Sequence, residues 1–343
     1  MISLANYTSG SAHEATCHRV VLRSHAVTPT GSDVDPRRFA VHHADLSTGV
    51  RLAYLREGAG GRPLLLLHGY PETMRIWWRN VAPLATAGFD VVVPDLRGFG
   101  ASGIAHDGRY DPPAYARDLH ALMTEVLDLD RCDVVGGDLG GVVAVDLALR
   151  FARLVDRLVL FNTVPPVLAD AYRAAGIPDD PPREQRPSAD YFVRQGTDAD
   201  GLIAELDTPA RRRSYVAGFY GSRLWAAPGA FSAEAVDFHV EPFLDAEKLR
   251  HSWGIYEFVC GRRPVVEIPR LFEPVELPAL VLYGPEDHVV PRTFHERMAV
   301  AFPHCVGPLV VPGAGHFLQW ERAELLNRVL AAFLLPRSDT KPD

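Results

Sequence analysis

The sequence predicts an α/β protein built on a mostly parallel, doubly wound sheet with an inserted helical cap. Short apolar runs typical of buried strands alternate with helical stretches over most of the chain. This alternation is the pattern of a sheet with helices on both faces. It stops between Phe161 and Leu280, where prolines and aromatic residues gather instead. Because so long a structureless loop is uncommon in a compact domain, we expect a separate helical layer there.

The individual elements follow from local patterns. Two runs flank the turn residues Ser47-Thr48-Gly49 and predict a hairpin, and continuous apolar runs such as Leu64–Leu67 predict strands buried on both faces. The predicted strands span residues 39–46, 50–55, 64–67, 91–93, 132–135, 158–161, 280–283 and 309–311. The predicted helices of the core span residues 77–86, 114–127, 142–151, 292–301 and 323–334.

We expect three parts along the chain. A core covers residues 37–162 and 276–337, and the helical cap covers residues 163–275. Residues 1–36 are turn-rich and polar with no sustained period, which predicts a flexible N-terminal extension. A misassigned start codon is the alternative explanation for that segment.

Composition excludes several classes of partner. The net charge of −8, from 35 basic and 43 acidic residues, disfavours nucleic acid and anionic membranes. The sequence shows no run of eighteen apolar residues and no visible signal peptide, so we expect no membrane span and a cytoplasmic location. Four scattered cysteines without metal-type spacing predict reduced thiols: Cys17, Cys132, Cys260 and Cys305. The oligomeric state cannot be inferred from these features.

One segment predicts a nucleophile. Residues 133–141 read as a buried strand, a tight turn and the start of a helix. Gly136 and Gly140 match the glycines of the nucleophile-elbow pattern Gly-x-Ser-x-Gly, and Asp138 stands in place of the serine. A carboxylate is already a nucleophile at neutral pH. It is suited to a strained or activated carbon, and poorly suited to an amide or a simple ester.

An acid and a base follow in the order expected for such an elbow. Asp287 and His316 each come after a predicted strand, and His316 lies among small residues. We expect the His316 ring to reach Asp138 while the acid orients its other nitrogen. Glu286 is the rival acid. Asn162 also follows a strand but is not a carboxylate, so that alternative acid position is empty.

A further turn predicts backbone donors. His68-Gly69-Tyr70-Pro71 follows the strand at 64–67, and Gly69 would permit a close approach of the backbone. Pro71 is a candidate for a cis peptide bond. The N–H groups of Tyr70 and Leu139 would together form an oxyanion hole. A plain β-turn is the alternative reading.

On these residues the chain resembles the α/β-hydrolase-fold epoxide hydrolases, over roughly residues 39–335. The segments that carry the resemblance are His68–Pro71, Arg97–Ser102, Gly136–Gly141, Asp287 and Gly315-His316. Residues 189–192 and 251–256 resemble the family's two tyrosine segments, which implies that Tyr191 and Tyr256 hold and protonate the epoxide oxygen. The implied mechanism passes through an ester on Asp138 and needs no metal or organic cofactor. The aromatic cap suggests an apolar or aromatic epoxide as substrate.

Two other functions stay open at this point. Haloalkane and haloacid dehalogenases of this fold use the same triad, but they typically follow the nucleophile with tryptophan or arginine. Leu139 is neither, although Trp77, Trp78 or Trp253 could supply a halide donor. The third possibility is a non-catalytic ligand-binding protein of the same fold, against which the intact catalytic set argues.

Overall fold

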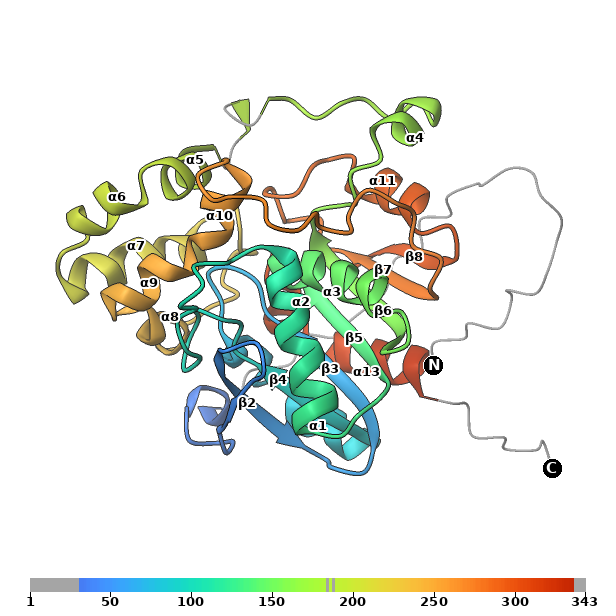
Figure 1. Cartoon of the computed structure of the whole chain (residues 1–343), viewed down its shortest axis with the longest axis horizontal. Helices are drawn as coiled ribbons and strands as arrows, with labels where there is room; N and C mark the ends of the chain where they lie inside the picture. Colours follow the sequence, from blue (N-terminus) through green and yellow to red (C-terminus); the bar gives the residue numbers. More distant parts are fainter. Residues whose placement is uncertain (1–30, 183–184, 187–188, 336–343) are drawn as a thin grey trace, which may run out of the picture.

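The protein folds around one eight-stranded sheet with the strand order β1-β2-β4-β3-β5-β6-β7-β8. The computed structural model describes residues 31–182, 185–186 and 189–335 (Figure 1). Strands β3 to β8 run parallel, whereas β1 and β2 form an antiparallel hairpin that joins the sheet beside β4. The mostly parallel sheet and the hairpin that the sequence predicts are therefore confirmed.

The regular elements have the following bounds. The strands are β1 (His42–Asp45), β2 (Arg51–Glu57), β3 (Arg62–Leu67), β4 (Phe89–Pro94), β5 (Cys132–Gly137), β6 (Val155–Thr163), β7 (Ala279–Tyr283) and β8 (Cys305–Val310). The α-helices are α1 (Val81–Ala87), α2 (Pro112–Ala121), α3 (Asp138–Arg150), α4 (Ala169–Ala174), α5 (Ala189–Thr197), α6 (Ala199–Glu205), α7 (Pro209–Gly221), α8 (Ala233–Val240), α9 (Ala246–Ser252), α10 (Gly254–Val259), α11 (Phe294–Ala301), α12 (Leu318–Glu321) and α13 (Ala323–Leu334). Shorter turns are the 3₁₀ helices η1 (Gly31–Val34), η2 (Met74–Trp77) and η5 (Glu241–Phe243), and the π-helical turn η3 (Leu122–Val126). No helix among these described elements is long and apolar enough to cross a membrane.

Helices cover both faces of the sheet. Helix α3 packs against α2, β5 and β6, whereas α1 packs against α13 and β4. Figure 1 shows α2 and α3 in front of the sheet. The central strands are buried from both sides, as their uninterrupted apolar runs predict, and all four leucines of Leu64–Leu67 have no exposed surface.

The largest differences from the predicted helix starts, four residues each, are at α3 and α1. Helix α3 starts at Asp138 and not at residue 142, because the two glycines that read as a turn form the first turn of the helix. Residues 77–86 were predicted as one helix, but they divide into the end of η2 and the α-helix α1, which begins at Val81. Pro83 explains the later start, since proline fits only the first turn of a helix, where its missing N–H costs nothing.

The register of the parallel strands brings the carboxyl ends of the strands to one edge. Gly137 of β5 pairs with Phe161 of β6, which in turn pairs with Leu282 of β7. The residues beyond these positions emerge side by side, starting with Asp138 and Asn162. A site built from several strand ends is expected at such an edge.

Between β6 and β7, every regular element in the described part of the chain is a helix. Figure 1 shows α5 to α10 gathered as a layer beside the sheet. This layer is fastened to the core near the turn after β3. The guanidinium of Arg75 donates to the carbonyl of Phe238 at 2.8 Å, and the hydroxyl of Tyr220 donates to the carbonyl of Pro71.

The N-terminal segment is described only from residue 31. Asp33 forms ion pairs with Arg38 at 2.9 Å and with Arg79 at 3.4 Å. The indole N–H of Trp78 donates to the carbonyl of Asp35 at 3.0 Å. Residues 33–35 therefore lie against the core. The rest of the predicted extension, residues 1–30, lies outside the described residues, as do residues 336–337 at the end of the predicted core.

Candidate active site

Asp138 lies at a sharp turn between β5 and α3. Its φ of +46° is a left-handed conformation that residues other than glycine rarely adopt. The hydroxyl of Thr163 donates to the carbonyl oxygen of Asp138 at 2.6 Å and holds the turn. Gly140 must lack a side chain, because a Cβ there would lie 2.5 Å from the carbonyl oxygen of Leu67. The segment thus forms a strained strand–turn–helix that presents a carboxylate at the strand end.

Asp287 and His316 approach Asp138 from the loops that follow β7 and β8. The Nδ1 atom of His316 lies 2.8 Å from Oδ2 of Asp287, and its Nε2 atom lies 3.4 Å from Oδ2 of Asp138. Asp287 is buried, and its other oxygen accepts the N–H of Val289 at 2.8 Å. The rival acid Glu286 is exposed. The structure therefore brings together the nucleophile, acid and base that the sequence singles out, and it distinguishes between the two acids.

Two carboxylates flank the buried ring of His316. Burial alone would lower the pKa of His316, because it penalises the charged imidazolium. The carboxylates of Asp287 and Asp138 outweigh this effect and hold the pKa of His316 well above its ordinary value. The two carboxylates therefore favour the protonated form of the ring. Any reaction that neutralises Asp138 removes part of what keeps the proton on the ring.

The turn after β3 sets a backbone donor against the same carboxylate. The N–H of Tyr70 donates to Oδ1 of Asp138 at 2.8 Å. A Cβ on Gly69 would lie 2.5 Å from the Cβ of Asp138, so only glycine permits this approach. His68 braces the turn: its Nε2 accepts a backbone N–H from the loop after β4 at 2.9 Å, and its Nδ1 donates to the carbonyl of Gly69 at 2.9 Å. Burial lowers the pKa of His68 to about 4, which keeps this ring neutral. The Tyr70–Pro71 bond is cis, as predicted.

A cavity of about 790 Å³ opens at Asp138 and extends between core and cap. Asp138 and Leu139 line it from the core, and Tyr191 of α5 and Tyr256 of α10 line it from the cap. The two tyrosine rings lie 5.9 Å apart at an interplanar angle of 86°. Burial raises the pKa of both phenols well above the ordinary value, so both stay protonated at neutral pH. Leu139 lies in the first turn of α3, where backbone N–H groups have no partner within the helix.

Asn162 lies at the end of β6, the alternative position for a catalytic acid, where the sequence has no carboxylate. Its Nδ2 donates to the carbonyls of Gly315 at 2.7 Å and His316 at 3.1 Å, and its Oδ1 accepts the N–H of Gly284 at 2.9 Å. The amide therefore ties the loop of His316 to the turn that leads to Asp287. Sequence reasoning missed this role, because a strand-end asparagine does not reveal which loops it will reach.

Two buried glutamates brace the loops on either side of the nucleophile. Glu72 accepts the N–H of Gly69 at 2.6 Å, and Glu321 accepts the N–H of Gly315 at 2.6 Å. Burial raises the pKa of each carboxyl to about 7. Sequence reasoning missed both. Only Glu321 leaves a signal, since a glutamate in the first turn of a helix that reaches back to preceding N–H groups resembles a capping box.

The hydroxyl of Tyr70 links this turn to the cap. It accepts hydrogen bonds from Nε2 of Gln195 at 2.7 Å and from Nε1 of Trp253 at 3.0 Å. Gln195 is buried and follows Tyr191 by four residues on α5, so both side chains lie on one face of that helix. Sequence reasoning missed Gln195, because an isolated glutamine within a helix carries no pattern of its own.

Three tryptophans could donate to a halide on the sequence evidence, but they do not line the cavity around Asp138: Trp77, Trp78 and Trp253. Trp253 donates to Tyr70, and Trp78 donates to a backbone carbonyl near the N-terminus. The Nε1 atom of Trp77 is buried and has no hydrogen-bond partner among the described residues. The structure therefore provides no indole donor for a leaving halide within the described lining of this cavity.

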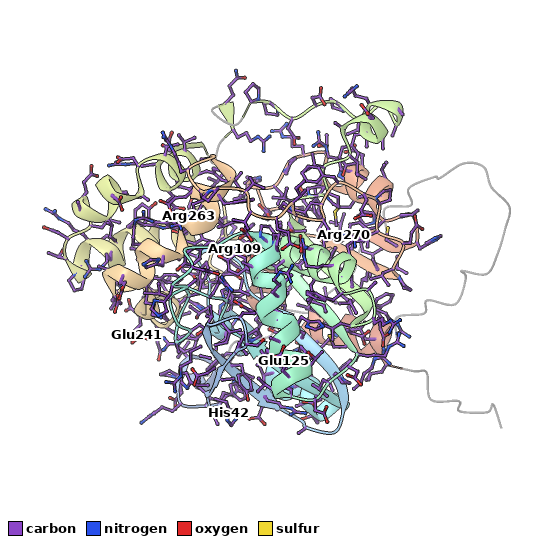
Figure 2. All side chains as sticks on the ribbon, in the orientation of Figure 1. His42, Arg109, Glu125, Glu241, Arg263 and Arg270 are labelled. Carbon is purple, nitrogen blue, oxygen red and sulfur yellow. The ribbon has the colours of Figure 1, made fainter. Side chains whose placement is uncertain are left out.

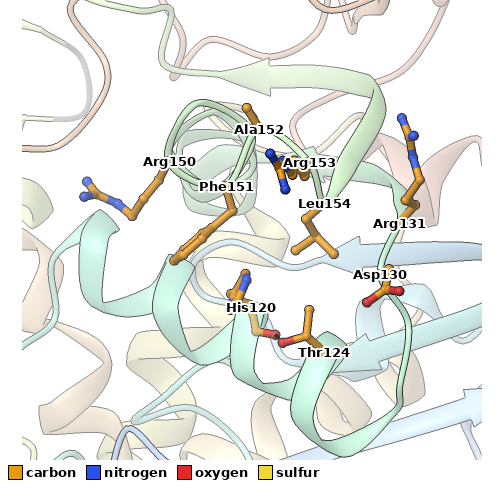
Figure 3. A pocket seen from close by; sticks show the side chains of 9 residues that line it. All are labelled: His120, Thr124, Asp130, Arg131, Arg150, Phe151, Ala152, Arg153 and Leu154. Atoms are coloured by element: carbon orange, nitrogen blue, oxygen red, sulfur yellow. Dashed lines mark hydrogen bonds between the residues drawn. The ribbon is translucent and has the colours of Figure 1, made fainter.

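A second cavity, of about 880 Å³, lies at the amino ends of β5 and β6. Figure 3 shows its lining from α2, η3 and the loops that precede those two strands, with the ring of His120 stacked on Phe151 at 4.0 Å. None of the site residues predicted from the sequence lines this cavity. Within the described ranges, no three His, Cys, Asp or Glu side chains are grouped so as to hold a metal ion.

An elbow that carries the nucleophile at the carboxyl edge of such a sheet defines a class of hydrolytic enzymes. The family model for the alpha/beta hydrolase fold matches residues 62–323, and the chain belongs to this family. The matched range contains every site residue named above.

Relatives in this family differ in what their names say they act on. The chain is 29% identical over 333 residues to epoxide hydrolase A of Mycobacterium tuberculosis, covering 84% of this chain and 95% of the relative. It is 29% identical over 303 residues to a 2-hydroxy-6-oxononadienedioate/2-hydroxy-6-oxononatrienedioate hydrolase of Paraburkholderia xenovorans, covering 83% and 91%. Among solved structures, epoxide hydrolase CorEH matches with a TM-score of 0.73 and 25% identity, covering 86% of this chain and 98% of that one. Because these relatives differ in their named substrates, the reaction of this chain has to be inferred from the geometry of its site.

Proposed function

We propose that this protein is an epoxide hydrolase that converts an epoxide to a vicinal diol through an alkyl ester on Asp138. One observation carries the proposal: a carboxylate at the elbow faces a cavity with two protonated tyrosines, Tyr191 and Tyr256. The oxygen of an opening epoxide stays on the substrate and needs proton donors at that position. The epoxide hydrolases among the relatives support the same reaction.

In the first half-reaction, the carboxylate of Asp138 attacks one ring carbon. A carbon–oxygen bond of the ester forms while a carbon–oxygen bond of the epoxide breaks. Tyr191 and Tyr256 donate hydrogen bonds to the departing oxygen, and one of them gives it a proton. Their raised pKa values keep both protons in place until negative charge develops on the substrate.

Formation of the ester also prepares the base. Because Asp138 is no longer charged, one of the two anions that raise the pKa of His316 disappears. The proton that the imidazolium then loses passes by way of solvent to the tyrosine that has protonated the substrate, which restores that phenol. The neutral ring stays oriented by Asp287, whose Oδ2 lies 2.8 Å from its Nδ1.

In the second half-reaction, His316 takes a proton from a water molecule and the resulting hydroxide adds to the carboxyl carbon of Asp138. The tetrahedral oxyanion is stabilised by the N–H groups of Tyr70 and Leu139, each contributing roughly 3 kcal/mol. Collapse of this intermediate breaks the bond between the carboxyl carbon of Asp138 and the ester oxygen, which leaves with the substrate. The departing diol oxygen takes its proton from His316, and the proton that remains on the new carboxyl group of Asp138 passes to the neutral ring, whose Nε2 lies 3.4 Å from Oδ2. The Asp138 carboxylate and the protonated ring are thereby restored.

Trapping the ester tests the proposal. His316→Gln removes the base of the second half-reaction, so incubation with epoxides should increase the intact mass by that of one epoxide, and peptide mapping should place the adduct on Asp138. His304→Gln is a matched control, because the His304 side chain is 64% exposed and lies outside the site. Asp138→Asn should form no adduct. A trapped variant that stays unmodified across a broad panel of epoxides would contradict the proposal, and an adduct formed only with haloalkanes would favour the dehalogenase.

A further inference from the structure

The exposed apolar side chains of the molecule are concentrated at the cavity that contains Asp138. Ten large apolar residues are exposed among those that the structure describes. Six of the ten line this one cavity: Val164, Val167, Val259, Val265, Ile268 and Phe272. We call these six residues the rim. Scattered exposed apolar residues need no explanation, but a contiguous group around a cavity marks a binding surface.

The rim is built by two chain segments that meet beside the nucleophile. Val164 and Val167 follow directly after Thr163, whose hydroxyl donates to the carbonyl of Asp138 at 2.6 Å. The N–H of Val167 donates to the carbonyl of Leu271 at 2.7 Å, in the segment between α10 and β7. The rim therefore extends from residues beside Asp138 to exposed side chains of the segment that precedes β7.

In the second segment, Glu267 and Arg263 are partly buried and paired, whereas three apolar side chains are exposed. Glu267 turns toward the core and forms ion pairs with Arg117 at 2.8 Å and with Arg150. Figure 2 shows Arg263 and Arg270 near the boundary between core and cap. Both are engaged: Arg263 pairs with a glutamate of α10 at 2.6 Å, and the side chain of Arg270 donates to a backbone carbonyl at the end of α3.

The apolar residues between these charges face outward. Val265, Ile268 and Phe272 are 63%, 70% and 58% exposed. The ion pairs hold this segment in a conformation that places apolar side chains in water. Such an arrangement is unfavourable without a ligand, at about 25 cal/mol for each Å² of apolar surface left in water. A ligand that covers the rim removes this cost.

The two arginines in the described lining of the cavity both lie against one carboxylate. Arg297 pairs with Asp180 at 2.8 Å, and Arg186 lies 3.7 Å from the same carboxylate. No other arginine or lysine is found among the described residues that line the cavity. The wall therefore offers no unpaired cation to a carboxylate on the substrate.

We propose that the substrate is an epoxide carried at one end of an extended, uncharged apolar body. The ring lies at Asp138 between Tyr191 and Tyr256, and the body follows the cavity outward and covers the rim. This inference rests on the proposed function and adds the class of substrate. A volume of about 790 Å³ belongs to the range of cavities that hold drug-sized ligands, well beyond what a three- or four-carbon epoxide would fill.

A series of terminal epoxyalkanes from four to twelve carbons tests this substrate class. We expect kcat/KM to rise with chain length by up to about fourfold for each methylene group that becomes buried, which corresponds to about 0.8 kcal/mol. An epoxide of the same length that ends in a carboxylate should be a poorer substrate than the hydrocarbon. A flat or falling series, or a preference for the carboxylate, would overturn the inference while leaving the proposed function intact. If no epoxide of any length forms diol, the proposed function fails, and the inference fails with it.

Rim variants provide the second arm of the test. Val265→Asp and Ile268→Asp should each lower the ratio of kcat/KM for the twelve-carbon over the four-carbon epoxide by about tenfold. Val126→Asp is the matched control, because Val126 is 39% exposed and lies on η3, away from the cavity, and it should leave the ratio unchanged. A ratio that stays constant in the rim variants would overturn the inference. A second result would also overturn the inference: the wild type is a dimer, and Ile268→Asp converts it to a monomer without changing the ratio. In that case a second copy of the chain, and not the substrate, would cover the rim.

Discussion

Core and cap build the two sides of one cavity by different means. On the core side, buried side chains hold the loops at the strand ends by hydrogen bonds to the loop backbone. Asn162 bonds to the loop of His316, and His68 bonds to the turn of Tyr70. On the cap side, Tyr191 and Tyr256 are held among aromatic rings, and Phe192 packs edge-on to Tyr256 at 4.8 Å. Under the proposed mechanism, hydrogen bonds to the backbone position the groups that form and cleave the ester, whereas aromatic packing positions the tyrosines that protonate the substrate.

Breaking the core side should produce the largest effect. Asp287→Asn keeps the shape of the side chain but removes the charge that orients and stabilises the His316 imidazolium, so kcat for diol formation should fall by about 10⁴-fold. Glu286→Gln is the matched control, since it neutralises the exposed neighbouring carboxylate and should change kcat less than about twofold. Steady-state diol formation measures both variants. Equal losses in the two would show that the buried position of Asp287 does not mark the acid.

Breaking the cap side should slow a different step. Tyr191→Phe and Tyr256→Phe each remove one donor to the epoxide oxygen, so the rate of ester formation should fall by about 10²-fold. Hydrolysis of an ester already formed should proceed at the wild-type rate. Rapid quenching followed by intact-mass measurement separates the two rates. Tyr54→Phe is the control, because Tyr54 lies on β2 and does not line the cavity. Slower hydrolysis in the phenylalanine variants would contradict the division of labour between core and cap.

The core side could be predicted from the sequence because its signals are local. Gly136 and Gly140 flank Asp138 after a short apolar run, and this pattern is typical of a strained nucleophile elbow. His316 could be found for a related reason, since it stands among small residues directly after a strand. The cap side could not be derived in this way. Tyr191 and Tyr256 lie on short helices among many aromatic residues, and only the resemblance to a family selects them.

Apart from Glu321, the supporting residues could not be predicted from local patterns. Asn162 and Gln195 act on loops that are distant in the sequence, so their roles depend on the register of β5, β6 and β7 and on how the cap is seated. Gln195 is the clearest case. It is 125 positions from Tyr70, to whose hydroxyl it donates, and nothing in either segment indicates the contact.

The hydrogen bonds to the Tyr70 hydroxyl join the core to the cap, so they allow a further test of the comparison between these two parts. Tyr70→Phe removes both hydrogen bonds that the cap donates to the Tyr70 hydroxyl, and Gln195→Leu removes one of the two. We expect Gln195→Leu to slow hydrolysis of the ester by about fivefold, which corresponds to the loss of roughly 1 kcal/mol of hydrogen bonding, and Tyr70→Phe to slow it at least as much. The double variant should be no slower than Tyr70→Phe alone, since that variant already lacks the bond from Gln195. Additive losses, or losses in ester formation alone, would mean that the cap does not position this turn.

The last expected effect is on stability and not on catalysis, and it concerns Glu72, which holds the same turn from the core side. Burial raises the pKa of Glu72 from 4.5 to about 7, so the folded protein binds this proton more tightly than the unfolded chain. The carboxyl therefore favours folding most at low pH, and its contribution is lost as pH rises from about 4.5 to 7. Glu72→Gln does not titrate, so its stability relative to the wild type should improve between pH 5 and pH 8 by up to about 3 kcal/mol. Chemical denaturation of both proteins at the two pH values measures this difference. A difference that is independent of pH would show that Glu72 is already ionised at pH 5 and that its bond to the N–H of Gly69 outweighs its burial.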